Sequence, residues 1–157
     1  MDDLNSEAKT EILLILLTLL VFLISGLVFL ITQFRTLDEI RPENQRLSPP
    51  KVWLQLIPVY GLVWQFFVIS RLSDSIRAEL NSPIGDAIFS EDPVPANVRP
   101  TFAVGIAYAT CFCVGAIPID MIKGAASLLG IIFWVTYWIQ LAKYKRKITK
   151  RIKLSGA

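Results

Sequence analysis

The feature that most constrains this chain is a long apolar run near its start. Residues 12–34 are almost all Leu, Ile, Val and Phe, and no charged residue lies between Glu11 and Arg35. A helix of these 23 residues extends about 34 Å, and a hydrocarbon core is about 30 Å thick. The run therefore predicts a transmembrane helix. A cleaved secretory signal is the alternative, but it needs a basic start and a shorter run, so we expect a retained span.

The composition extends this prediction to the rest of the chain. Hydrophobic residues make up 54% of the sequence and charged residues only 18%, whereas soluble domains carry about 25% charged residues. Three further apolar runs follow at residues 52–70, 101–117 and 124–142. The sequence thus predicts an all-α polytopic membrane protein, with four transmembrane helices in a single bundle over residues 1–157.

The second helix is expected to continue beyond the bilayer. It follows Pro49-Pro50, a favoured helix start, and Leu72, Ile76 and Leu80 keep helical spacing among polar residues. We therefore expect the second helix to extend into the cytoplasm. Residues 81–100 hold four prolines and are expected to form a loop.

Only a short connection, residues 118–123, separates the third run from the fourth. Such a connection predicts an antiparallel hairpin of two helices.

Lysine and arginine counts predict the orientation, because cytoplasmic loops carry the excess of basic residues. With four crossings, 11 basic residues share the side of both termini and five lie on the other side. Both termini are then expected in the cytoplasm, as in a multi-pass protein of the cell (cytoplasmic) membrane. Four of the five residues on the disfavoured side belong to the first loop: Arg35, Arg41, Arg46 and Lys51.

Small residues on the third and fourth runs predict close helix packing, because membrane helices associate where their backbones approach. The alternative is that glycine and alanine are simply common in such helices. At 100° per residue the small residues form stripes. They are Gly105 and Ala109 on one face, Ala103, Ala107, Cys111 and Gly115 on another, and Ala126 and Gly130 on the fourth run.

The second run separates polar from aromatic residues. Gln55, Pro58 and Gln65 share one arc, while Tyr60 and two tryptophans gather opposite. Pro58 predicts a kink. The intramembrane polar residues Gln55, Tyr60 and Gln65 either join helices by hydrogen bonds or line a polar path, and we favour the first reading.

A basic tail follows the fourth run. Because lysines and arginines gain about 1 kcal/mol each at an anionic leaflet, we expect the tail to bind lipid headgroups. Nucleic-acid binding is the less favoured alternative. The basic residues are Lys143, Lys145, Arg146, Lys147, Lys150, Arg151 and Lys153.

Several kinds of chemistry have no residues to perform them. The chain has no histidine, and so lacks the usual general base and metal ligand near neutral pH. Cys111 and Cys113 point about 200° apart on one helix and are expected to be packing thiols. No charged residue lies within the four runs; Asp120 and Lys123 lie between the last two. We therefore expect no enzyme activity, catalytic residue, metal or cofactor.

One segment carries a resemblance. Val52-Trp53-Leu54-Gln55-Leu56-Ile57-Pro58, with Val63-Trp64-Gln65-Phe66 and Ser70-Arg71-Leu72-Ser73-Asp74-Ser75, resembles a signature of small uncharacterised bacterial integral membrane proteins. The resemblance implies a bacterial cytoplasmic-membrane setting and no particular activity.

These observations predict a non-enzymatic membrane protein that acts through helix packing, as a homo-oligomer or as a small subunit of a membrane complex. The alternative is a homo-oligomeric pore whose conduit is lined by the polar face of the second span. The expected partners are the lipid bilayer with its anionic headgroups and other membrane protein subunits, and not nucleic acid.

Overall fold

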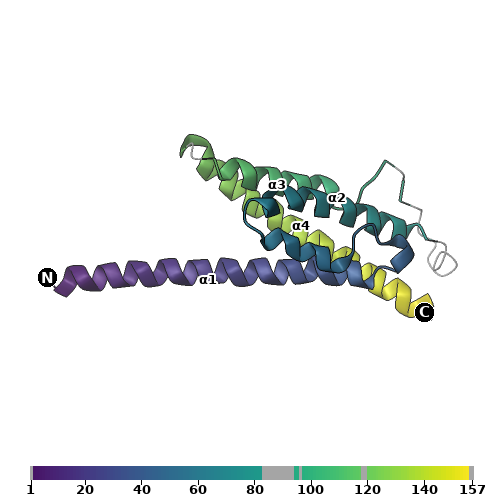
Figure 1. Cartoon of the computed structure of the whole chain (residues 1–157), viewed down its shortest axis with the longest axis horizontal. Coiled ribbons are helices and arrows are strands. Elements are labelled where there is room, and N and C mark those ends of the chain that lie inside the picture. Colours follow the sequence, from purple (N-terminus) through teal and green to yellow (C-terminus); the bar gives the residue numbers. More distant parts are fainter. Residues whose placement is uncertain (1, 83–93, 96, 118–119, 156–157) are drawn as a thin grey trace. The chain divides into compact units, whose positions relative to one another are not determined.

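The structure, a computed structural model, describes residues 2–82, 94–95, 97–117 and 120–155. All regular elements in these ranges are helices, so the predicted all-α class is confirmed (Figure 1). They are α1 (Asp2–Glu39), the 3₁₀ helices η1 (Pro42–Asn44) and η2 (Pro49–Leu56), then α2 (Tyr60–Leu80), α3 (Phe102–Gly115) and α4 (Asp120–Ser155). The chain forms two units, Met1–Ile31 and Thr32–Ala157, which we describe separately.

The first unit is the amino-terminal part of α1. Its large apolar side chains from residue 12 to residue 24 each expose between 50% and 65% of their surface, and the hydroxyl of Thr18 donates to the carbonyl of Leu14 at 2.8 Å. An apolar helix that exposes its side chains all round is costly in water, at about 25 cal/mol per Å². These side chains are suited to a lipid environment.

Two helices in the described part of the chain are long and apolar enough to cross a membrane, Glu7–Glu39 and Gly124–Leu154. The predicted second span does not form one helix. Residues 52–56 belong to η2, and the chain reverses at Pro58 and Val59 before α2 begins. Eight residues of 3₁₀ helix extend only about 16 Å, so η2 is too short to cross a bilayer.

The reversal has local causes. Val59 adopts a positive φ of 63°, and Pro58 has no N–H with which to continue a helix. Gly61 then allows α2 to start directly against η2, because a Cβ at this position would lie 2.1 Å from the carbonyl oxygen of Gln55. The indole of Trp64 donates to the carbonyl of Lys51 at 2.8 Å and joins the two arms. The predicted kink at Pro58 is therefore a tight hairpin.

Helix α2 forms the centre of the second unit and continues to Leu80, so the predicted extension of this helix beyond residue 70 is confirmed. Val68, Ile69, Leu72 and Ile76 on α2 expose none of their surface. Positions 68, 69, 72 and 76 follow the pattern i, i+1, i+4 and i+8, which places them on one face, as packing of an amphipathic helix requires.

Helices α3 and α4 form the predicted antiparallel hairpin (Figure 1). A Cβ at Gly105 would meet Tyr137, and a Cβ at Gly130 would meet Phe112, so residue numbers on the two helices run in opposite directions. Helix α3 has 14 residues, about 21 Å, and is shorter than the predicted third span. Helix α4 continues without interruption through the basic tail to Ser155.

The segment after α1 lies against the end of α2. The buried carboxylate of Glu79 accepts from Arg41 Nε at 2.9 Å and from Asn44 Nδ2 at 2.7 Å. At the end of α1, Glu39 forms an ion pair with Lys145 of α4 at 3.3 Å. Four alternating crossings would place the first loop and the tail on opposite faces of the membrane. These contacts join the first loop and the tail, and with two helices long and apolar enough to cross a membrane the predicted four transmembrane helices are not confirmed.

Candidate functional site

The carboxyl-terminal third of α4 divides its basic residues between two faces. Lys143, Arg146, Lys150 and Lys153 are exposed. Their spacing of three, four and three residues places them on one stripe of the helix, because successive residues are 100° apart. Leu141 and Ile148 on the other side expose none of their surface. We call Lys143, Arg146, Lys150 and Lys153 the basic stripe.

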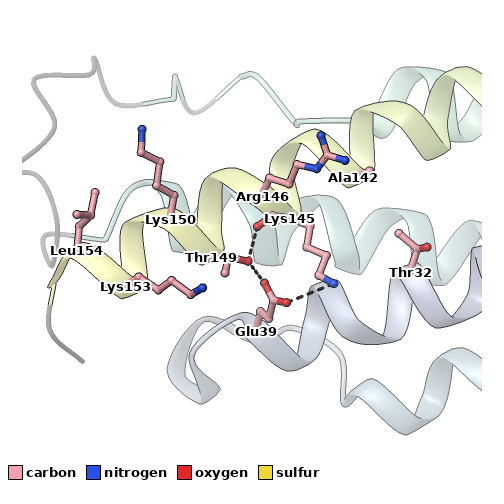
Figure 2. Close-up of a pocket in the computed structure, with 9 residues that line it drawn as sticks. All are labelled: Thr32, Glu39, Ala142, Lys145, Arg146, Thr149, Lys150, Lys153 and Leu154. Atoms are coloured by element: carbon pink, nitrogen blue, oxygen red, sulfur yellow. Dashed lines mark hydrogen bonds and ion pairs between the residues drawn. The ribbon is translucent and has the colours of Figure 1, made fainter.

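An open groove of about 720 Å³ lies beside this stripe. Figure 2 shows that α4 provides one wall and the end of α1 the other, with Lys145 and Thr149 pointing to Glu39 and with Lys150 pointing away from it. The groove is lined by Thr32, Glu39, Ala142, Lys145, Arg146, Thr149, Lys150, Lys153 and Leu154.

Glu39 is the acidic residue of this lining. Its carboxylate pairs with Lys145 at 3.3 Å and accepts from the hydroxyl of Thr149, which also contacts the carbonyl oxygen of Lys145 at 2.9 Å. One carboxylate therefore faces one lysine, and three further cations remain around the groove: Arg146, Lys150 and Lys153. Their positive charge and the apolar side chains of Ala142 and Leu154 suit an anionic amphiphile.

Two other residues of the predicted headgroup set contact the protein itself. Arg151 exposes only 8% of its surface, and its guanidinium donates to the carbonyl oxygen of Leu80 at 2.6 Å. That carbonyl belongs to the last turn of α2, where helix carbonyls have no partner within the helix. Lys147 is half-buried. The basic tail is therefore docked on α2 and α1, and its stripe faces outward.

The predicted packing residues lie largely at contacts within the chain. Gly105 lies between Ile69 of α2 and Tyr137 of α4, and Ala109 exposes none of its surface. A Cβ at Gly115 would lie 3.1 Å from Ser127 Oγ, one at Gly130 would lie 3.2 Å from the Phe112 ring, and Ala126 exposes only 7%. Ala103 is exposed and Ala107 half-buried. At Gly105, the face with Gly105 and Ala109 is filled by α2 and α4 of the same chain.

The predicted polar residues lie in separate places. Gln55 Nε2 donates to Gln33 Oε1 at 2.6 Å, and Gln65 Nε2 donates to the carbonyl of Leu62 at 3.0 Å. Tyr60 is 44% exposed and stacks on Trp64 with ring centroids 5.4 Å apart. The structure does not bring these three side chains together around one space.

Sequence reasoning missed Gln33 as a functional or packing residue. It exposes none of its surface and bonds to Gln55, so it joins the end of α1 to η2. One signal was present, because Gln33 is the only amide side chain within residues 12–34. A lone amide in an apolar run usually marks a helix–helix hydrogen bond.

Trp138 of α4 contacts the end of α1. The indole of Trp138 donates to Thr32 Oγ1 at 3.0 Å, and the ring centroids of Trp134 and Trp138 lie 5.3 Å apart.

Cys111 and Cys113 are free thiols, and Gln65 Nε2 lies 3.9 Å from Cys113 Sγ. The side chains of Asp120 and Lys123 lie outside the described residues.

Comparison of the chain with protein-family models, with curated proteins and with solved structures gives no match.

Proposed function

We propose that the chain is a non-enzymatic integral membrane protein that acts through helix packing and holds anionic lipid headgroups at its cytoplasmic end. The observation that carries this proposal is the basic stripe of α4, which lies beside a groove and directly continues an apolar helix. Four exposed cations in a row at the end of a candidate span match what an anionic leaflet attracts, with about 1 kcal/mol for each residue near the surface.

The contacts also support a particular orientation. Thr32 contacts Trp138, and Glu39 contacts Lys145, so the last turns of α1 run in the same direction as α4. A bilayer crossed by residues 12–34 has the residues before this run on one face and those after it on the other. We propose that the carboxyl-terminal tail is cytoplasmic and that the amino terminus is on the opposite face. This differs from the expectation that both termini are cytoplasmic.

In this arrangement α1 and α4 cross the membrane. The hairpin of η2 and α2 enters the membrane from the cytoplasmic side and leaves it on the same side. Helix α3 returns beside α4 as a short crossing, which a locally thinner bilayer accommodates. Of the 16 lysines and arginines in the chain, only Lys9 and Lys123 then lie on the outer side. The positive-inside rule supports this order more strongly than it supports four alternating spans.

The headgroup proposal is tested by measuring lipid selectivity. The full chain is reconstituted into nanodiscs of phosphatidylcholine with 20% phosphatidylglycerol, and the lipids retained after mild detergent extraction are counted by native mass spectrometry. We expect phosphatidylglycerol to be enriched on the protein. Changing Lys150 and Lys153 to Gln should remove most of that enrichment.

The matched control changes Arg35 and Lys51 to Gln, which removes the same charge from two exposed residues outside the groove lining. We expect this control to retain most of the enrichment. Equal lipid selectivity in the two double variants would contradict the headgroup proposal.

Oligomerisation and membership of a larger complex stay part of the proposal, and the mass of the native particle distinguishes them. A pore receives less support, because the amides of Gln55 and Gln65 bond within the chain. A buried amide with a partner acts as a link between segments, whereas a conduit needs amides that face water. Dye release from liposomes that contain the pure protein would reverse this preference.

A further inference from the structure

A second basic pocket lies at the end of α2 and shares no lining residue with the α4 groove. Its volume is about 440 Å³. Arg71 and Arg77 come from α2, and Arg46 comes from the segment after η1. The complete lining is Arg46, Arg71, Asp74, Arg77, Ala78 and Asn81. Three arginines line one small space, and this arrangement needs a physical explanation, since like charges repel.

Buried polar side chains of α2 hold the loop arginine in this position. Ser75, which exposes none of its surface, accepts from the backbone N–H of Arg46 at 2.8 Å and lies 2.8 Å from the carbonyl of Arg71. One hydroxyl therefore fixes the backbones of two of the three arginines. Glu79 binds Arg41 and Asn44 one turn further on, which anchors the same segment. The pocket is built on fixed elements, as a binding site requires.

The acid among the described lining residues, Asp74, is shared with an arginine outside the pocket. Both oxygens of Asp74 bind Arg99, with Arg99 Nε at 2.9 Å from Oδ1 and Arg99 Nη2 at 2.6 Å from Oδ2. Arg77 also lies 3.6 Å from Asp74. One carboxylate thus faces two arginines. Arg71 and Arg46 add two more positive charges, and the guanidinium of Arg71 lies 5.0 Å above the Phe67 ring.

We propose that this pocket binds a phosphate monoester, with Arg46 and Arg71 as the main donors and Arg77 as a third cation. A guanidinium group presents its N–H donors in a planar fork that matches the oxygens of a phosphate, and bound phosphate would relieve the repulsion among the arginines. Asn81 also lines the pocket, but its side-chain amide already forms two hydrogen bonds with the backbone of Val94, of 3.0 and 2.8 Å. The proposal goes beyond the headgroup function of α4 and uses different residues.

The phosphate monoester has two possible sources, a water-soluble metabolite or a lipid such as phosphatidic acid. The test uses the full chain in nanodiscs of phosphatidylcholine alone. Calorimetric titration with glycerol 3-phosphate examines the soluble source. Native mass spectrometry of nanodiscs with 5% phosphatidic acid examines the lipid source. Saturable binding in only one of these two experiments identifies the source. Binding in both supports a site that recognises the phosphate group and not the rest of the molecule.

Variants then test the residues. We expect Arg46→Gln to weaken binding tenfold or more and Arg46→Lys, which keeps the charge without the fork, to weaken it less. Arg35→Gln removes an exposed arginine outside the pocket and should leave the affinity within twofold. Absence of binding in both arms, or an equal loss in Arg35→Gln, would overturn the proposal.

A further variant separates this proposal from the headgroup function. Changing Lys150 and Lys153 to Gln should leave glycerol 3-phosphate binding unchanged, because neither residue lines the pocket. A loss of binding in this variant would mean that the α4 groove is the phosphate site and would also overturn the proposal. Equal far-ultraviolet circular dichroism of all variants establishes that each one folds.

Discussion

Gly105 is the residue on which three helices converge. An added Cβ would lie 2.5 Å from Ile69 Cγ2 on α2 and 2.9 Å from Tyr137 Cε2 on α4. Both distances are shorter than the contacts that Cβ atoms make in proteins, so the neighbouring side chains would have to move. The stripe of small residues on α3 predicted close packing at this position, but it could not tell whether the neighbour was another chain or the same chain.

The first prediction concerns this glycine. Gly105→Ala should lower the midpoint of thermal unfolding in detergent, because overpacking costs about 1–3 kcal/mol. Gly124→Ala is the matched control, since Gly124 is also helical and an added Cβ there meets nothing within 4 Å. Alanine is favoured over glycine in a helix by about 1 kcal/mol, so the control should be neutral or stabilising. Equal midpoints for the two variants would contradict the packing at Gly105.

Glu79 gives the second prediction. It exposes only 6% of its side chain, and Arg41 exposes 17%, so their ion pair is largely shielded from water. Glu79→Gln removes the shorter and more buried of the two ion pairs of Arg41 and should cost about 3 kcal/mol of unfolding free energy. Glu43, 65% exposed and 3.5 Å from the same arginine, is the control, and Glu43→Gln should cost less than about 1 kcal/mol. Denaturant titration measures both, and a similar cost for the two would contradict the burial of Glu79.

At the scale of elements, helices with one continuous pattern could be predicted and the reversal at residues 57–60 could not. The antiparallel α3–α4 hairpin and the extension of α2 follow from apolar periodicity and a short connection. The reversal lies inside a run that is apolar on both sides, so mean hydropathy does not change there. Pro58 and Gly61 were visible, but a proline inside a membrane helix also produces a simple kink. The outcome depends on contacts of η2 with α1 and α2, which sequence does not show.

Docking of the basic tail is the property of α4 that can be tested. Arg151→Met removes the bond to the carbonyl oxygen of Leu80 and should increase amide exchange over residues 145–155 about tenfold, because the tail then opens more often. Lys150→Met changes the exposed neighbouring residue and should leave exchange unchanged. Hydrogen–deuterium exchange with mass spectrometry provides the comparison. Unchanged exchange in Arg151→Met would show that this bond does not hold the tail.

For the whole molecule, the sequence indicated a membrane protein, and hydropathy alone did not determine the order of its crossings. The first loop, with Arg35, Arg41, Arg46 and Lys51, was the inconsistent part of the four-span map, because its basic residues lay on the disfavoured side. The ion pair between Glu39 and Lys145 gives the physical reason for the difference. It holds the end of α1 beside the tail, and in the proposed topology the intervening η2–α2 hairpin returns to the face on which it started.

The most direct test labels single cysteines with a membrane-impermeant maleimide in sealed, inside-out vesicles, in a background that lacks Cys111 and Cys113. The positions are Glu7, Glu43 and Lys153, all of them exposed. We expect cysteines at Glu43 and Lys153 to react from the cytoplasmic side and one at Glu7 to be protected until the vesicles are opened. Labelling of Glu7 together with Lys153, with Glu43 protected, would restore four alternating spans and contradict the account.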